Sequence, residues 1–79
     1  MTYQEILEKI RELLVSQLPI IPEQVRPGSK LIEDLEADSA NIMILICDIE
    51  NEFEIQVDND VLSTIRTVDD VVKYIQSCL

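Results

Sequence analysis

Apolar residues recur at helical spacing in the first segment of the chain. They stand three and four residues apart, the period of an amphipathic helix that packs on a core. The stripe consists of Ile6, Leu7, Ile10, Leu13, Leu14 and Leu18. Thr2 precedes it and Glu5 follows three residues later, which is the order of a capping box. The pattern predicts a helix over about 3–17, ended by Pro19.

A long connection separates this helix from the next apolar segment. Residues 18–38 hold all three prolines of the chain and its one glycine, residues that interrupt regular structure. We expect a single helical turn at 22–25. We also expect five apolar residues to anchor the connection on the core: Ile20, Ile21, Val25, Leu31 and Leu35.

The second helix is predicted over about 39–52. Asp38 and Ser39 suit its start, because their side-chain oxygens accept hydrogen bonds from free backbone N–H groups. A helical wheel gives a core face of Ile42, Leu45, Ile46, Ile49 and Phe53, with Met43 at its edge. The opposite face carries Ala40, Ile44, Cys47 and Asn51. Either this opposite face meets a partner, or the long loop or a third helix covers it.

The last helix is predicted after Thr67, which caps it. Asp69 and Asp70 lie in its first turn, where the helix dipole favours acids. Its inward stripe consists of Val68, Val71, Val72 and Ile75. Upstream, the acidic and amide side chains of Asp58, Asn59 and Asp60 could suggest a calcium loop. We reject this interpretation, because Leu62 and Ser63 stand where that loop requires a polar ligand and a glycine. Asp58 or Asn59 is instead predicted to cap a short helix.

Length and charge narrow the functional classes. Seventy-nine residues make one small domain, 1–79, with an aliphatic core and no room for a deep catalytic cleft. Residues 1–30 are neutral, with four acids and four bases, whereas residues 31–79 hold twelve acids against Arg66 and Lys73. Such a surface disfavours nucleic acid and anionic membranes. It favours weak, fast encounters with basic patches on enzymes.

The cysteine count and the first residues point to a reducing compartment. The chain has Cys47 and Cys78 but no histidine, so we expect no zinc site and no other metal site. Residues 1–5 lack the basic start and apolar run of a signal peptide. We therefore expect a cytoplasmic protein with reduced thiols and no membrane insertion.

Ser39 is predicted at an exposed helix start, but nothing nearby activates it. The chain has no histidine and no lysine within eight residues of Ser39, and a serine hydroxyl is a weak nucleophile without a base. We assign no catalytic residue. A modification site fits better, because a phosphate ester there would meet free N–H groups and the positive end of the helix dipole. Glu36 and Asp38 would oppose that charge.

At these residues the chain resembles the acyl carrier protein family, whose signature reads D-L-G-x-D-S-L. The corresponding segment is Asp34-Leu35-Glu36-Ala37-Asp38-Ser39-Ala40. The similarity continues through Glu50-Asn51-Glu52-Phe53, Ile65-Arg66-Thr67-Val68 and Tyr74-Ile75. The resemblance implies an all-α antiparallel bundle of three main helices, with a long first loop and a short third helix within 54–66. In that short segment we expect Val57, Val61, Leu62 and Ile65 to be buried.

The resemblance also implies a function without catalysis by the chain itself. A separate magnesium-dependent phosphopantetheinyl transferase would move 4'-phosphopantetheine from coenzyme A to Ser39. The thiol of this arm would then hold acyl groups as thioesters for acyl-transferring and synthase enzymes. We expect these enzymes to carry basic docking patches. We expect the carrier to be a monomer, because its outer face must stay available.

Two departures from the signature bear on partner choice. Glu36 replaces the usual glycine, and Ala40 replaces a leucine that contacts partner enzymes in the family. Ile44 and Asn51 replace acids, so docking should be more apolar. The predicted partner surface consists of Glu36, Asp38, Ala40, Met43, Ile44, Cys47, Asp48, Asn51 and Glu52.

Three functions stay open from the sequence. The first is a carrier for fatty-acid synthesis. The second is a carrier for a dedicated polyketide, peptide or modified-lipid pathway, which Glu36, Ala40 and Ile44 favour slightly. The third is an unmodified acidic adaptor that keeps the fold and binds a basic partner.

Overall fold

The computed structural model describes residues 1–79, with Asn59 described by its backbone alone. In chain order, its helices are α1 (Tyr3–Gln17), the 3₁₀ turn η1 (Pro22–Gln24), α2 (Ser39–Phe53), the 3₁₀ helix η2 (Asn59–Ser63) and α3 (Val68–Cys78). Within the described backbone the β pairing is limited to one isolated bridge, between Lys30 and Thr67. The predicted all-α fold is confirmed, and so is the single turn at 22–25.

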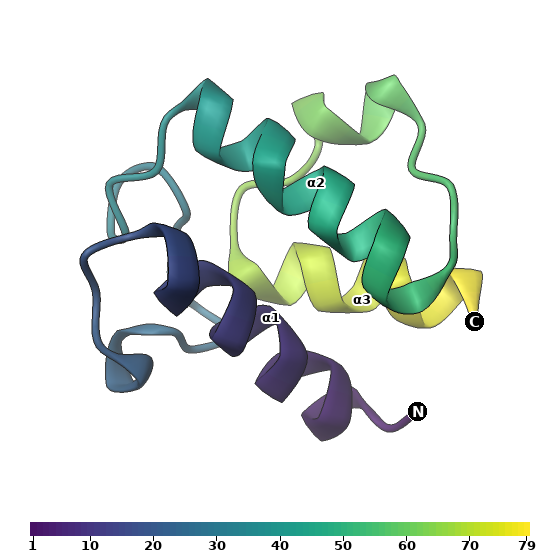
Figure 1. Ribbon diagram of the computed structural model, residues 1–79, viewed down its shortest axis with the longest axis horizontal. Coiled ribbons are helices and arrows are strands. Elements are labelled where there is room, and N and C mark those ends of the chain that lie inside the picture. The colour runs from purple at the N-terminus through teal and green to yellow at the C-terminus, as the bar shows by residue number, and fades with distance from the viewer.

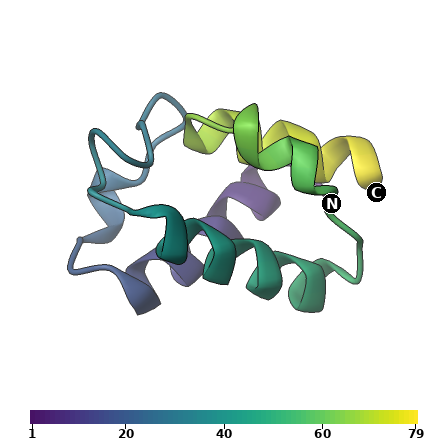
Figure 2. The same ribbon diagram turned by 90° about the horizontal axis from the view of Figure 1, so that it is seen from above.

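The three α-helices form a small bundle in which α1 packs against both α2 and α3. Helix α1 runs in the opposite direction along the bundle to the other two (Figure 1). Helices α2 and α3 run in the same general direction, because the segment between them, residues 54–67, returns the chain to the end where α2 begins (Figure 2). That end is formed by the long loop, and both chain termini lie at the other end.

Each α-helix begins with a capping box. In it, two residues three positions apart each use a side-chain oxygen to accept a hydrogen bond from the backbone N–H of the other. The pairs are Thr2 with Glu5, Asp38 with Asn41, and Thr67 with Asp70. The predicted range of the first helix and the predicted start of the last helix are confirmed, and α2 extends one residue further than predicted. Asp58 takes the predicted N-cap position of η2, but its side chain makes no capping hydrogen bond. The alternative cap, the Asn59 side chain, lies outside the described part.

The core draws side chains from every α-helix and from the long loop. Its fully buried members are Ile6, Ile10, Leu14, Val25, Leu31, Leu35, Leu45, Ile49, Val68, Val71, Val72 and Ile75. Three of the five predicted loop anchors are therefore confirmed, while Ile20 is half-buried. Ile21 is a wrong prediction, since 58 % of it is exposed. It lies just before the η1 turn, which directs it away from the bundle.

Several other predicted core residues lie at the edge of the core. In the segment after α2, Ile65 is buried, as predicted. Half-buried residues that were expected to be buried or on the core face are Leu13, Ile42, Val57, Val61 and Leu62. Residues 54–67 thus lie at the edge of the core and are only partly buried, and they do not pack on the bundle as a fourth helix would.

The long loop is held against the beginning of α3 by backbone hydrogen bonds. Leu31 N–H donates to Arg66 O at 2.9 Å, and Val68 N–H donates to Ser29 O at 3.0 Å. Inside the loop, the hydroxyl of the buried Ser29 donates to Gln24 O at 2.7 Å. These bonds satisfy loop backbone groups that burial would otherwise leave unpaired. They fix the end of the molecule from which α2 starts.

Candidate functional site at the start of α2

Ser39 is the first residue of α2, and Asp38 takes the cap position before it. Asp38 has an extended backbone, with φ −103° and ψ −177°. Its carboxylate accepts from Asn41 N–H at 2.8 Å, and the Asn41 side-chain oxygen accepts from Asp38 N–H at 3.1 Å. Because this pair caps the helix, the Ser39 hydroxyl is not needed for capping. It stays exposed at the first turn of the helix.

The five serines of the chain differ in what their hydroxyl groups bind. The other four donate to backbone carbonyls: Ser16 to Leu13, Ser29 to Gln24, Ser63 to Asp60 and Ser77 to Tyr74. Among the side chains that the structure describes, Ser39 alone of the serines makes no such bond. Its hydroxyl is therefore exposed at a fixed place and not engaged within the chain.

The chain that leads into Ser39 is held in place from both sides. Leu35 and Ala37 are buried, and Ala37 N–H donates to Leu31 O at 2.9 Å. On the other side, the Asn41 amide donates to the Gln17 side chain of α1 at 3.4 Å. The start of α2 is thus fixed by the loop before it and by the last turn of α1.

Glu36 lies between the two buried residues and has a left-handed backbone, with φ 58°. Residues with a Cβ atom adopt this conformation at a cost, whereas glycine adopts it freely. The signature has glycine at this position, so the conformation gives a physical reason for that glycine. The signature marks Glu36 as a departure, and the structure adds that its backbone is left-handed.

The surroundings of Ser39 are acidic. Residues 31–65 contain no lysine and no arginine. At the edge of this stretch, Lys30 forms an ion pair with Glu33 at 3.2 Å, and its backbone N–H donates to the Asp34 carboxylate at 2.8 Å. The positive end of the α2 dipole partly offsets these charges for a group attached at Ser39. A basic partner therefore complements this surface.

The outer face of α2 is open. Ala40, Met43, Ile44, Cys47 and Asn51 are all exposed, with 47 % of Met43 and 50 % of Ile44 accessible. The alternative that the loop or a third helix covers this face is wrong. The other predicted members differ: Asp48 is half-buried, and Glu52 forms an ion pair with Lys9 of α1 at 2.9 Å. The structure thus turns Glu52 toward α1.

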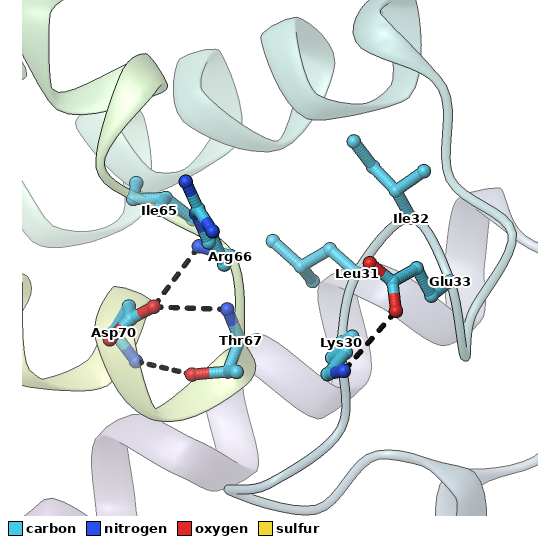
Figure 3. A pocket seen from close by; sticks show the side chains of 8 residues that line it. All are labelled: Lys30, Leu31, Ile32, Glu33, Ile65, Arg66, Thr67 and Asp70. Carbon is cyan, nitrogen blue, oxygen red and sulfur yellow. Dashed lines mark hydrogen bonds and ion pairs between the residues drawn. The ribbon is translucent and has the colours of Figure 1, made fainter.

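A pocket of about 430 Å³ lies between the long loop and the start of α3. Figure 3 shows residues 30–33 on one side and residues 65–67 with Asp70 on the other. The buried Leu31 and Ile65 make its apolar wall, and Ile32, which is 59 % exposed, also lines it. No sequence signal marked this pocket, because it depends on the pairing of the loop with α3.

The described part of the chain shows neither a cluster of metal-binding side chains nor a membrane-spanning helix. No cluster of three or more His, Cys, Asp or Glu residues there is placed to hold a metal ion. Likewise, the described helices include none with the length and hydrophobicity that a membrane crossing requires.

Comparison with known proteins adds to this geometry. A family model described as "Phosphopantetheine attachment site" matches residues 8–75, which include the loop, Ser39 and most of the three α-helices. The chain belongs to this phosphopantetheine-binding, acyl carrier protein family. The covalently attached 4'-phosphopantetheine of the family is thus implied for this chain. Acyl carrier proteins are carriers and not enzymes.

Individual relatives agree with this assignment. The acyl carrier protein of Wolinella succinogenes is 40 % identical over 72 residues, which cover 91 % of this chain and 95 % of the relative. That of Chlorobium phaeobacteroides is 37 % identical over 75 residues, covering 95 % and 96 % of the two chains. The solved structure of an acyl carrier protein from Enterococcus faecalis superposes over the full length of both chains, with a TM-score of 0.83 and 30 % identity.

Proposed function

We propose that Ser39 carries the 4'-phosphopantetheine arm of this acyl carrier protein. The observation that carries the proposal is the exposed Ser39 hydroxyl, which alone among the chain's serines makes no described hydrogen bond to a backbone carbonyl. The position suits a phosphodiester, since first-turn N–H groups and the helix dipole stabilise an anion there.

The attachment reaction requires a separate enzyme. The Ser39 oxygen would form a bond to the phosphorus that bears pantetheine, and the phosphoanhydride bond of coenzyme A would break. Adenosine 3',5'-bisphosphate would leave. The serine proton must pass to a base of the transferase, because the chain has no histidine and exposed carboxylates are weak bases. The attached arm supplies a thiol that holds acyl groups as thioesters.

The proposed partner surface combines the acidic loop before Ser39 with the open face of α2. Glu36 and Asp38 supply negative charge, while Met43 and Ile44 supply exposed apolar area. Partners with a basic rim around an apolar contact fit this surface. The same open face supports a monomer, and the two exposed free cysteines suit a reducing cytoplasm.

The pocket between the long loop and α3 supports a place for apolar cargo. It lies between the long loop and the start of α3 (Figure 3), and both segments are at the end of the bundle where α2 begins (Figure 2). Leu31 and Ile65 give it an apolar wall, and the removal of a short acyl chain from water would be favourable there. The acyl group on an attached arm could thus bind in this pocket.

Fatty-acid synthesis is the first candidate pathway, because relatives that are 37–40 % identical carry the plain name acyl carrier protein. A dedicated pathway is the second, because Ile44 and Ala40 give α2 an apolar face with few charges. Incubation of the loaded carrier with the general fatty-acid elongation enzymes separates them. Elongation of the bound acyl group supports the first candidate, and failure to elongate supports the second.

Mass spectrometry of the intact protein tests the attachment. The purified chain is incubated with coenzyme A, magnesium and a phosphopantetheinyl transferase. We expect a gain of one phosphopantetheine in the wild type and in Ser63→Ala, and none in Ser39→Ala. An unmodified wild type, with Ser39→Ala still functional in cells, would favour the adaptor instead.

A further inference from the structure

We infer that Glu36 is a specificity determinant for the transferase, whose surface places a lysine or arginine against the Glu36 carboxylate. This inference rests on the proposed attachment at Ser39. Glu36 is not a catalytic residue in this role, because the proposed contact is with the surface of the transferase and not with the serine oxygen or the phosphoryl group. It selects the enzyme that approaches Ser39.

The first support is how Glu36 differs from the other acids of its loop. Residues 31–38 contain four acids. Three of these are engaged by nearby groups of the chain: Glu33 by the Lys30 amine, Asp34 by the Lys30 N–H and Asp38 by the Asn41 N–H at the start of α2. Among the described side chains, none forms an ion pair or hydrogen bond with the Glu36 carboxylate. It is the one free acid of this loop.

The second support is the fixed presentation of this side chain. Leu35 and Ala37 on either side are buried, and their N–H groups donate to Lys30 O and Leu31 O. The backbone at Glu36 therefore cannot turn without breaking these contacts, and its side chain must point to solvent. A charge fixed on a rigid loop loses less conformational entropy on binding than a charge on a mobile one.

Distance along the chain points to the transferase as the enzyme concerned. Glu36 is three residues before Ser39, so the chain keeps their Cα atoms within about 11 Å of each other. An enzyme that brings coenzyme A to the Ser39 oxygen must cover this area. Enzymes that act on the cargo can dock on the same surface, but their reaction takes place at the thiol at the far end of the arm and not beside Glu36. Glu36 thus faces the transferase whenever the attachment reaction takes place.

Charge complementarity defines the partner group. Residues 31–65 contain no lysine or arginine, and no described ion pair involves the Glu36 carboxylate, so the partner supplies the cation that this charge lacks. Cations at a docking rim raise the association rate and set specificity more than they alter chemistry. Removal of the charge should therefore raise KM and leave kcat unchanged.

Glu54 supplies a matched control. It is also an exposed glutamate with a left-handed backbone, φ 55°, but it lies at the other end of α2. The 15 residues of α2 separate the two positions by about 20 Å. Glu36→Gln and Glu54→Gln remove the same charge at the same kind of backbone, and Glu36→Gly and Glu54→Gly also remove the backbone cost.

A panel of transferases is first tested on the wild type, and the one that modifies it fastest is chosen. With this enzyme, coenzyme A and magnesium, mass spectrometry then measures kcat and KM for formation of the modified protein. We expect Glu36→Gln and Glu36→Gly to raise KM about fivefold at low salt, the size of one exposed ion pair. We expect Glu36→Lys to raise it further and both Glu54 variants to match the wild type. The difference should shrink as salt screens the pair.

The possible results separate the two proposals. If the wild type is modified and Glu36→Gln matches it in KM, the inference about Glu36 is wrong while the attachment stands. The same holds if only Glu36→Gly differs, since the backbone and not the charge would then matter. If no transferase of the panel modifies the wild type while a control carrier is modified, the attachment proposal fails, and the inference fails with it.

Discussion

Glu36 and Glu54 lie on either side of α2, and both have a left-handed backbone, at φ 58° and 55°. The chain's one glycine, Gly28, has no positive φ. Glycine is therefore absent from both positions where its conformational freedom would help. Glu54 has the αL conformation at the helix end that glycine commonly occupies in proteins.

Replacement of either glutamate by glycine should stabilise the fold. We predict that Glu36→Gly and Glu54→Gly each raise the free energy of unfolding by about 0.5–1 kcal/mol, because the cost of Cβ in αL exceeds the entropy that glycine adds to the unfolded chain. Urea titration measures the change. Glu36→Ala and Glu54→Ala keep Cβ and should show no such gain. A loss of stability in both glycine variants would contradict the assigned backbone conformation.

The two faces of α2 should respond differently to truncation. Ile49 is buried on the inner face, and Ile44 is half exposed on the outer face. We predict that Ile49→Ala lowers the free energy of unfolding by about 2–5 kcal/mol. Ile44→Ala should change it by less than about 0.5 kcal/mol. Chemical denaturation of both variants measures this, and a similar loss in both would mean that the outer face is covered.

The phenol of Tyr3 should make stability fall at alkaline pH. Burial, with a hydrogen bond to Asp69 and its charge, raises the pKa of Tyr3 to about 12. The unfolded phenol has a pKa near 10, so the folded state retains the proton longer. The contribution is complete below about pH 10 and is lost as pH rises from about 10 to 12.

Tyr3→Phe isolates this contribution. Tyr74 also has a raised pKa, through burial first and then Cys78, and it titrates in both proteins. The difference in unfolding free energy between wild type and Tyr3→Phe should therefore shrink across this alkaline window. A difference that stays constant from pH 9 to pH 12 would contradict the hydrogen bond to Asp69.

The ionised carboxylate of Asp70 should stabilise the folded state at neutral pH, and this contribution should be lost in acid. Its carboxylate accepts from Thr67 N–H at 3.1 Å and from Arg66 N–H at 3.0 Å. These bonds, with that of Thr67 the larger, hold the pKa of Asp70 below its usual value. Its contribution is complete above pH ~4 and is lost as pH falls through the lowered folded pKa.

Asp70→Asn tests this acid dependence. The variant should be less stable than wild type at neutral pH, and the gap should narrow as pH falls below about 4. Thermal unfolding across this range measures it. An equal gap at pH 3 and pH 7 would show that the carboxylate charge contributes nothing.

The parts of the fold that the sequence predicted depend on local interactions. Thr2, Asp38 and Thr67 mark helix starts because each bonds a backbone N–H three residues away, and apolar spacing along a helix is read within two turns. Ile21 was predicted wrongly because its burial depends on how the η1 turn sits against α1. The pocket between the loop and α3 likewise needs a pairing that joins residues distant in sequence.

In the candidate site, too, the features set by local sequence could be predicted, and those set by contacts between distant segments could not. Ser39 could be found from its local motif. The partner of Glu52 could not, because Lys9 lies on another helix and 43 positions away. The left-handed backbone of Glu36 was also out of reach, since it results from the burial of Leu35 and Ala37 by the rest of the bundle.

The most direct test of the central claim is the location of the modification among the five serines. Tandem mass spectrometry of peptides from the modified protein identifies the residue that carries phosphopantetheine. We predict that the group is found on Ser39 and on none of Ser16, Ser29, Ser63 or Ser77, whose hydroxyls donate to backbone carbonyls. Modification of any of those four, or of Ser39→Ala, would contradict the assignment.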